Sequence, residues 1–265
     1  MTRMTAPKFK ALKGEKKLVC LTAYDVLTAG VLDAAGVDLI LVGDSMGNVV
    51  LGHDTTLPVT LDQMVTAAGA VMRARPRALV VADMPYLSFH LSPAETVRNA
   101  GRLVVEAGVD GVKLEGGVER LPHIRHLLQA RIPVMGHLGL TPQSVLEFGG
   151  YRVQARTPEA AEALVENAKA LEDAGCFAVV LEGVPAPAAE RVTAALSVPT
   201  IGIGAGPGCD GQILVVSDLL GLTAEAPRFV RRYADLRSVM TDAVRRFADD
   251  VREGRFPGTE ETYPE

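Results

Sequence analysis

Eight short runs of aliphatic and β-branched residues alternate with longer amphipathic stretches, and this alternation constrains the fold more than any other feature of the chain. Strands that alternate with helices pair in parallel, because each crossover helix returns the chain to the same end of the sheet. Eight such units in 265 residues are typical of a closed barrel, so the sequence predicts one (β/α)8 TIM-barrel domain over residues 1–265. The expected strands are Lys17–Thr22, Asp38–Asp44, Leu79–Asp83, Val109–Glu115, Pro133–His137, Phe177–Glu182, Pro199–Ile203 and Gln212–Ser217.

The expected helices carry recognisable start and stop signals. Thr or Ser followed by Pro opens several of them, and Gly closes others, as expected for an N-cap and a left-handed stop. Residues Gly204–Gly211 are too few for a crossover helix, so the connection between strands seven and eight should be shortened. A long C-terminal helix is expected over Phe229–Arg252. The main crossover helices are expected at Leu61–Arg75, Pro93–Glu106, Pro158–Asp173 and Ala186–Leu196.

Composition argues against several classes of partner. The net charge is −5 and no long basic run occurs, which disfavours nucleic acid and anionic membranes. The chain has no stretch of about 18 apolar residues to cross a bilayer, and its polar first residues do not read as a signal peptide. The three cysteines, Cys20, Cys176 and Cys209, are odd in number and widely spaced, which suits a reducing compartment. We therefore expect a cytoplasmic protein.

Polar residues fall where the predicted strands end. Asp44, Asp83, Glu115, His137 and Glu182 each follow a run of apolar residues. The carboxyl ends of barrel strands form the active-site face, so these side chains should share one small cavity. Crowded carboxylates repel one another unless a cation neutralises them, and oxygen ligands suit a hard ion such as Mg²⁺. The sequence therefore predicts a magnesium site at this end of the barrel.

Each of these residues also has a purely structural interpretation. Asp44 or Asp83 alone could cap the following helix. Lys113, which shares a strand face with Glu115, could form a buried ion pair with it, and His137 alone could be an ordinary core histidine. The convergence of so many charges favours a functional cluster, because buried charges are costly without a partner or a metal.

Two loops are ambiguous in the same way. The glycine-rich stretch Gly202–Gly208 could bind a phosphate, since barrel phosphate sites favour this position, but a tight turn that replaces the missing helix is the favoured interpretation. The loop Ser45–Asn48 could hold an anion on its backbone N–H groups or simply turn the chain.

Several motifs occur in order along most of the chain: TAYD from Thr22, GDSMGNVVLGHDTTLPVT from Gly43, ADMP from Ala82, VKLEGG from Val112, GHLGLTPQSV from Gly136, Leu181-Glu182, and TIGIGAGPGCDGQILV from Thr200. Together they resemble the ketopantoate hydroxymethyltransferase (3-methyl-2-oxobutanoate hydroxymethyltransferase) family. Gly208 and Ser217 depart from the resemblance, because the family often carries His at these positions, and Met46 and Asn48 vary a loop beside the expected metal.

The resemblance implies roles for individual residues. Glu182 matches the family's proton acceptor, and His137 would help to position substrate or folate. The keto-acid-binding positions are Asp44, Ser45, Asp83 and Lys113, and the Mg²⁺-binding carboxylates are Asp44, Asp83 and Glu115. The resemblance further implies 5,10-methylenetetrahydrofolate as co-substrate and a homo-oligomer, commonly a decamer.

The implied reaction transfers a hydroxymethyl group from this folate to 3-methyl-2-oxobutanoate through a Mg-stabilised enolate. The product would be 2-dehydropantoate (ketopantoate), an intermediate of pantothenate and coenzyme A synthesis. An alternative is a Mg-dependent lyase or mutase of the phosphoenolpyruvate-mutase/isocitrate-lyase type, which would need no folate. A third is a non-catalytic, ring-forming barrel that binds a metabolite.

Overall fold

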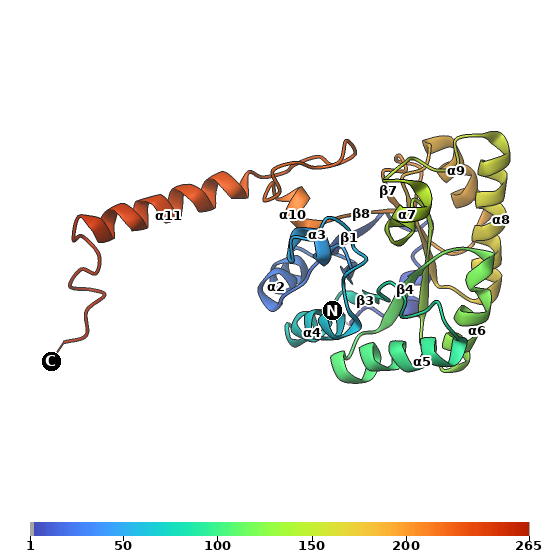
Figure 1. Cartoon of the computed structure of the whole chain (residues 1–265), viewed down its shortest axis with the longest axis horizontal. Coiled ribbons are helices and arrows are strands. Elements are labelled where there is room, and N and C mark those ends of the chain that lie inside the picture. The colour runs from blue at the N-terminus through green and yellow to red at the C-terminus, as the bar shows by residue number, and fades with distance from the viewer. Residues whose placement is uncertain (1–2, 265) are drawn as a thin grey trace. The chain divides into compact units, whose positions relative to one another are not determined.

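Eight parallel strands close into a barrel in chain order, with β8 pairing back onto β1 (Figure 1). The structure, a computed structural model, describes residues 3–264. The predicted barrel is confirmed, and each observed strand overlaps a predicted one. The strands are β1 (Leu18–Thr22), β2 (Leu39–Val42), β3 (Leu79–Asp83), β4 (Gly111–Glu115), β5 (Val134–Gly139), β6 (Ala178–Glu182), β7 (Thr200–Ile203) and β8 (Gly211–Leu214).

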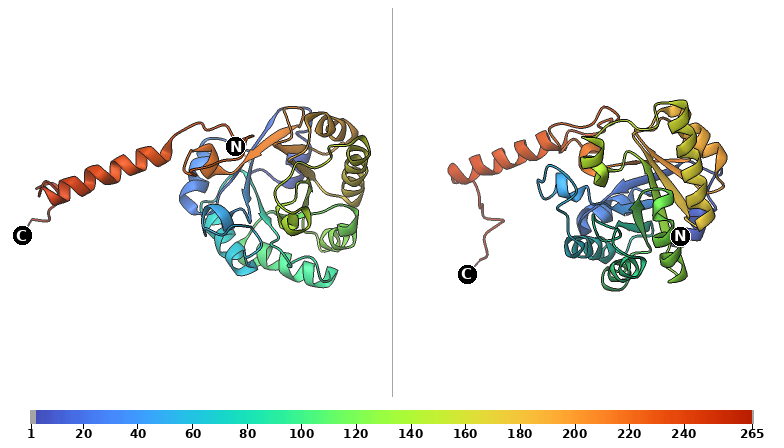
Figure 2. Two further views of the ribbon diagram at one scale, coloured as in Figure 1. Left: turned by 45° about the horizontal axis from the view of Figure 1, so that its top comes forward. Right: turned by 45° about the vertical axis from the view of Figure 1, so that its right-hand side comes forward.

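Helices lie around the outside of the barrel, as both views in Figure 2 show. Residues 204–210, all described by the structure, connect β7 to β8 without a helix, as predicted. The α-helices that precede β7 in the chain are α1 (Ala6–Lys10), α2 (Val26–Ala34), α3 (Met46–Val49), α4 (Leu61–Arg73), α5 (Pro93–Arg102), α6 (Leu121–Gln129), α7 (Val145–Phe148), α8 (Pro158–Ala174) and α9 (Ala186–Ala195).

Local capping explains where several helices begin and end. Thr60 and Gln63 form a reciprocal capping box at the start of α4. Thr157 caps α8 by accepting a hydrogen bond from the backbone N–H of Ala160, and Gly175 ends that helix with a φ of 109°. These are the signals that the sequence carries at these positions.

The helix predicted over Pro93–Glu106 differs from the observed one in its last turn. Helix α5 ends at Arg102, and Leu103–Ala107 continues as one π-helical turn. Gly108 then stops the turn with a φ of 85°, as predicted. Apolar periodicity does not reveal such a turn, because a π-helical turn inserts one residue while the helix keeps its apolar face.

The short helix α1 closes the amino-terminal end of the barrel. Its Phe9 is completely buried and meets Phe177 edge-to-face, with ring centroids 6.1 Å apart. Burial of such a side chain contributes about 1.5–3 kcal/mol. Aliphatic side chains from most of the strands complete this layer, so the amino-terminal half of the barrel is apolar.

The chain divides into two units, and the second begins at Val216. It contains α10 (Val216–Leu219) and α11 (Leu236–Arg252). The prediction that the long helix begins at Phe229 is wrong, because Asp235 caps the helix by accepting from the backbone N–H of Ser238. The assignment of residues 1–265 to a single domain stays a prediction. Among residues 3–264, no helix combines the length and hydropathy needed to cross a membrane.

Candidate active site

The predicted polar residues come together at the carboxyl end of the barrel. Alternation along each strand places them there: Leu79 and Val81 point into the apolar layer, so Asp83 faces the interior as well. The same rule brings Glu182 inward behind Ala178 and Val180. The register of adjacent strands then decides which of these residues lie side by side. It pairs Asp83 with Lys113, Glu115 with His137, and Gly139 with Glu182.

Lys113 is the central cation of this cluster. Its Nζ lies 2.8 Å from Asp83 Oδ1 and 3.1 Å from His137 Nδ1, and the side chain is 5% exposed. The alternative of a Lys113–Glu115 ion pair is therefore not what the structure shows, because Asp83 is the partner. Burial alone would lower the pKa of Lys113, but Asp83, Glu115 and Asp44 outweigh it and hold the pKa above its ordinary value. Lys113 thus stays charged.

His137 connects two carboxylates that lie on either side of it. Its Nδ1 is 3.5 Å from Glu115 Oε1, and its Nε2 is 3.2 Å from Glu182 Oε2, an ion-pair distance without hydrogen-bond geometry. Burial and Lys113 lower the pKa of His137, but Glu115 and Glu182 raise it above the ordinary value. The Glu182 side chain is 17% exposed while that of His137 is 3% exposed, so Glu182 is the member that a substrate can reach.

Gln143 is a site residue that sequence reasoning missed. Its backbone N–H donates to Glu115 Oε2 at 2.9 Å, and its side-chain Nε2 donates to Asp44 Oδ2 at 2.8 Å. Asp44 also donates its backbone N–H to Asp83 Oδ2 at 3.1 Å. Burial, then Asp83 and Glu115, raise the pKa of Asp44 well above its ordinary value. The only sequence signal for Gln143 was its place in a matching motif.

Tyr24 is a second residue that the sequence did not single out. Its hydroxyl group lies 2.9 Å from Ser45 Oγ, which places the predicted substrate-binding Ser45 beside the cluster. Burial raises the pKa of Tyr24 to about 12, with Asp83 and Asp44 adding to the effect. The phenol therefore remains protonated at neutral pH and fixes the position of Ser45.

The residues present fit a hard divalent cation. Three buried acids, Asp44, Asp83 and Glu115, gather around the buried Lys113, away from water. Gln143 Oε1 is a buried oxygen without a hydrogen-bond partner among the described residues, and Asp83 Oδ1 is paired with Lys113 Nζ at 2.8 Å. Such oxygens are the donors that Mg²⁺ prefers. Within residues 3–264, however, no three His, Cys, Asp or Glu side chains stand ready as a metal site, so these ligand roles stay a prediction.

Close packing accounts for the glycine-rich loop between β7 and β8. A Cβ at Gly206 would come 2.5 Å from Ala186 Cβ, and a side chain at Gly208 would displace Glu190, both on α9. Gly204 and Gly206 also have positive φ angles of 61° and 77°. The interpretation as a tight turn thus has a physical reason, whereas phosphate binding has no observation in its support.

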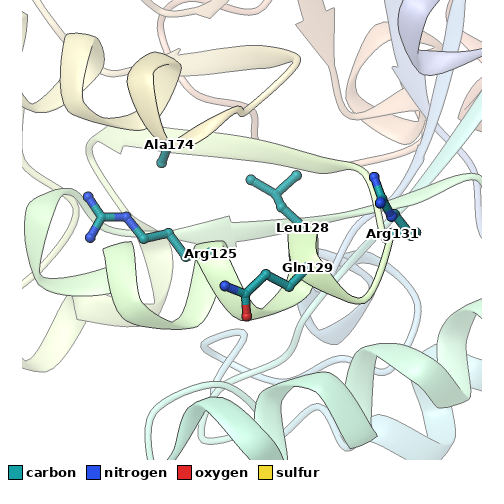
Figure 3. Close-up of a pocket in the computed structure, with 5 residues that line it drawn as sticks. All are labelled: Arg125, Leu128, Gln129, Arg131 and Ala174. Carbon is teal, nitrogen blue, oxygen red and sulfur yellow. The ribbon is translucent and has the colours of Figure 1, made fainter.

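A separate hollow of about 450 Å³ lies away from the cluster, at the ends of α6 and α8 (Figure 3). Arg125, Leu128, Gln129, Arg131 and Ala174 line it. These helix ends lead into the amino-terminal ends of β5 and β6, where barrels place stabilising rather than catalytic residues. The carboxyl end of a helix carries a partial negative charge, which the positive charge of the arginines here complements.

The fold and the cluster define a class: parallel (β/α)8 barrels that gather acid–base side chains at the strand ends. The sequence model of ketopantoate hydroxymethyltransferase matches residues 3–259, and the chain belongs to this family. It is 52% identical to the 3-methyl-2-oxobutanoate hydroxymethyltransferase of Syntrophomonas wolfei over 99% of this chain and 96% of that protein. It is 53% identical to the enzyme of the same name from Prosthecochloris aestuarii, over 99% and 97% respectively. The predicted family is confirmed.

Solved structures with a similar fold include barrel enzymes of other names. A 2,3-dimethylmalate lyase of the phosphoenolpyruvate-mutase/isocitrate-lyase superfamily has a TM-score of 0.60 at 20% identity, covering all of this chain and 93% of that one. A phosphonopyruvate hydrolase, solved with oxalate and Mg²⁺, has a TM-score of 0.63 at 15% identity, covering 99% and 92%. At these identities the likeness shows the fold alone. The lyase or mutase alternative therefore gains no support beyond the shared barrel.

Proposed function

We propose that the chain transfers a hydroxymethyl group from 5,10-methylenetetrahydrofolate to 3-methyl-2-oxobutanoate, forming 2-dehydropantoate in the cytoplasm. The family supports this reaction, and one observation on the cluster carries it: Glu182 is the more exposed carboxylate beside a buried His137, Lys113 and three further acids. That arrangement suits removal of a proton from the carbon next to a carbonyl, because a reachable base lies beside groups that stabilise developing negative charge.

The proposed substrate carries a carboxylate next to a ketone, and the cluster can hold both. Lys113 supplies the positive charge that balances the substrate carboxylate or the growing enolate. Asp44, Asp83 and Glu115 would hold Mg²⁺, and when bound this ion supplies Lewis-acid polarisation of the keto oxygen. Ser45, whose Oγ lies 2.9 Å from the Tyr24 hydroxyl group, would donate a hydrogen bond to the bound keto acid.

Glu182 then acts as the base. The bond between C3 and its hydrogen breaks, the proton goes to the Glu182 carboxylate, and the electron pair passes into the enolate. His137, with Nε2 3.2 Å from Glu182 Oε2, orients that carboxylate. The bond from the methylene carbon to one folate nitrogen breaks, and the nucleophilic C3 forms a bond to that carbon. Water then supplies the hydroxyl group as the bond to the second folate nitrogen breaks. The proton taken from C3 and the proton left by water go to the two nitrogens, which releases tetrahydrofolate.

A coupled assay for hydroxymethyl transfer tests the proposed function. We expect transfer that requires both the keto acid and the folate, is lost after chelation of divalent cations, and returns when Mg²⁺ is added. Release of pyruvate or glyoxylate without folate would instead support a lyase, and full transfer by metal-free protein would contradict the role of the cation.

Stabilisation by Mg²⁺ should depend on pH. Because the pKa of Asp44 is raised on folding, the folded state holds this proton more tightly, and stability is lost as pH rises through the raised pKa. A cation that binds the ionised cluster offsets this loss. Mg²⁺ should therefore raise Tm more at pH 8 than at pH 5, which thermal unfolding measures, and an equal shift at both pH values would contradict the prediction.

We also propose that the chain assembles as a homo-oligomer, with the decamer implied by the family as the expected state. None of residues 236–252, which the structure describes throughout, is buried in α11. Met240, Val244, Phe247 and Val251 recur at helical spacing along this helix and are exposed. Such an apolar stripe favours burial against another surface, and light scattering measures the resulting assembly.

A further inference from the structure

Gln143 lies between two carboxylates of the cluster that come from different strands. Gln143 lies in a short 3-10 helix, Pro142–Ser144, that follows β5, and the residue is 6% exposed. The turn reaches this place because Gly139, with a φ of 93°, redirects the chain across the end of β6. A Cβ at Gly139 would collide with the backbone oxygen of Glu182, so only glycine allows this path.

Each of the three buried acids has one oxygen held by an N–H group. Asp83 Oδ2 is held by the backbone of Asp44, whereas Gln143 holds the other two. Its backbone N–H donates to Glu115 Oε2 and its side chain donates to Asp44 Oδ2. The second amide hydrogen donates to the Met84 carbonyl at 2.9 Å, which fixes the side-chain rotamer.

An amide suits this position for electrostatic reasons. It supplies two N–H donors without adding charge, whereas a lysine would compete with a bound cation and a carboxylate would add repulsion. The remaining oxygen, Gln143 Oε1, is buried and accepts no hydrogen bond from any residue that the structure describes. A buried acceptor without a partner carries a free-energy cost, which a bound ligand would remove.

We propose that Gln143 is a positioning residue of the active site: it holds one oxygen each of Asp44 and Glu115 so that their other oxygens can bind the divalent cation. This inference rests on the proposed function, which supplies the cation. Groups that orient metal-binding side chains from behind typically change metal affinity or activity by 10–100-fold when they are removed.

The test is the variant Gln143→Met, which keeps the side-chain length but removes the amide. The backbone N–H to Glu115 remains, so the change removes only the side-chain hydrogen bonds to Asp44 and to the Met84 carbonyl. Calorimetry with Mg²⁺ alone should show a dissociation constant about 10–100-fold higher than in the unaltered protein. The Mg²⁺ concentration that gives half-maximal exchange of the C3 hydrogen with solvent should rise in parallel, and excess Mg²⁺ should restore part of the rate.

A matched control separates this role from simple structural support. Gln63→Met removes an amide from the capping box of α4, away from the cluster, and should lower Tm without changing the Mg²⁺ dissociation constant. Should Gln143→Met not fold, Gln143→Asn keeps an amide one carbon shorter and should also weaken Mg²⁺ binding by at least about 10-fold.

The outcomes distinguish the two proposals. If the unaltered protein binds Mg²⁺ and transfers the hydroxymethyl group while the Gln143 variants bind Mg²⁺ equally well, the positioning role is overturned and the proposed function stands. If the unaltered protein neither binds Mg²⁺ nor performs the transfer, the proposed function fails and the positioning role falls with it.

Discussion

Glu182→Gln should stop exchange of the C3 hydrogen of 3-methyl-2-oxobutanoate with solvent while leaving binding of the keto acid nearly unchanged. The amide has almost the same shape as the carboxylate, so its place beside His137 is kept, but it cannot accept the proton. A positioned general base contributes about 10²–10⁴-fold to the rate, and a loss of this size is expected in both exchange and transfer. Proton exchange followed by NMR, together with calorimetry of keto-acid binding, measures the two effects separately.

Glu166→Gln is a suitable control, because it makes the same chemical change on the exposed face of α8. Its exchange rate should equal that of the unaltered protein. Exchange that continues at the normal rate in Glu182→Gln would assign the base to another residue. A large loss of keto-acid binding in the same variant would show that Glu182 binds substrate rather than removes its proton.

Lys113→Ala should both destabilise the fold and weaken keto-acid binding. The lysine is the buried partner of Asp83, and removing one member of a buried pair typically costs about 3–5 kcal/mol, because the other charge remains without compensation. For a domain of this size that corresponds to a fall in Tm of roughly 6–20 °C. The substrate carboxylate would lose the positive charge that we place beside it.

Two comparisons make the Lys113 result specific. Lys169→Ala removes an exposed lysine from α8 and should change neither Tm nor the dissociation constant of the keto acid. Added Mg²⁺ should restore part of the lost stability of Lys113→Ala, since a cation can replace the missing charge among the carboxylates. A variant with normal Tm and normal keto-acid affinity would contradict both assignments.

The fold could be predicted from the sequence where local signals and the strand–helix repeat agree. The eight strands were expected close to their observed bounds, because parallel barrel strands are short, continuous apolar runs. The last was expected to run to Ser217, which instead lies in α10. The start of α11 was misplaced because apolar periodicity continues upstream from Leu236, whereas Asp235 caps the helix. The π-helical turn after Arg102 was missed since it preserves the apolar face.

The site was predictable for charged residues and not for neutral ones. Glu115 and Glu182 stand out because an acid at the end of an apolar strand is costly to bury without a purpose. Gln143 and Tyr24 carry no such signal, since an amide on a loop and a tyrosine after a strand are ordinary surface or core residues. Only closure of the barrel brings Gln143 between two carboxylates from separate strands.

Strand β7 brings a hydrocarbon side chain, not an acid, to this end of the barrel. On β7 the side chain that follows Ile201 into the interior is Ile203, and the register pairs it directly with Glu182. Glu182, the proposed proton acceptor, therefore has a hydrocarbon neighbour. A branched-chain keto acid that loses its hydrogen at the branch point needs both charged groups and an apolar surface beside the base. Its carboxylate and keto oxygens bind cations, whereas its methyl groups pack against hydrocarbon. The bulk of Ile203 would then set how large a branch can approach the base.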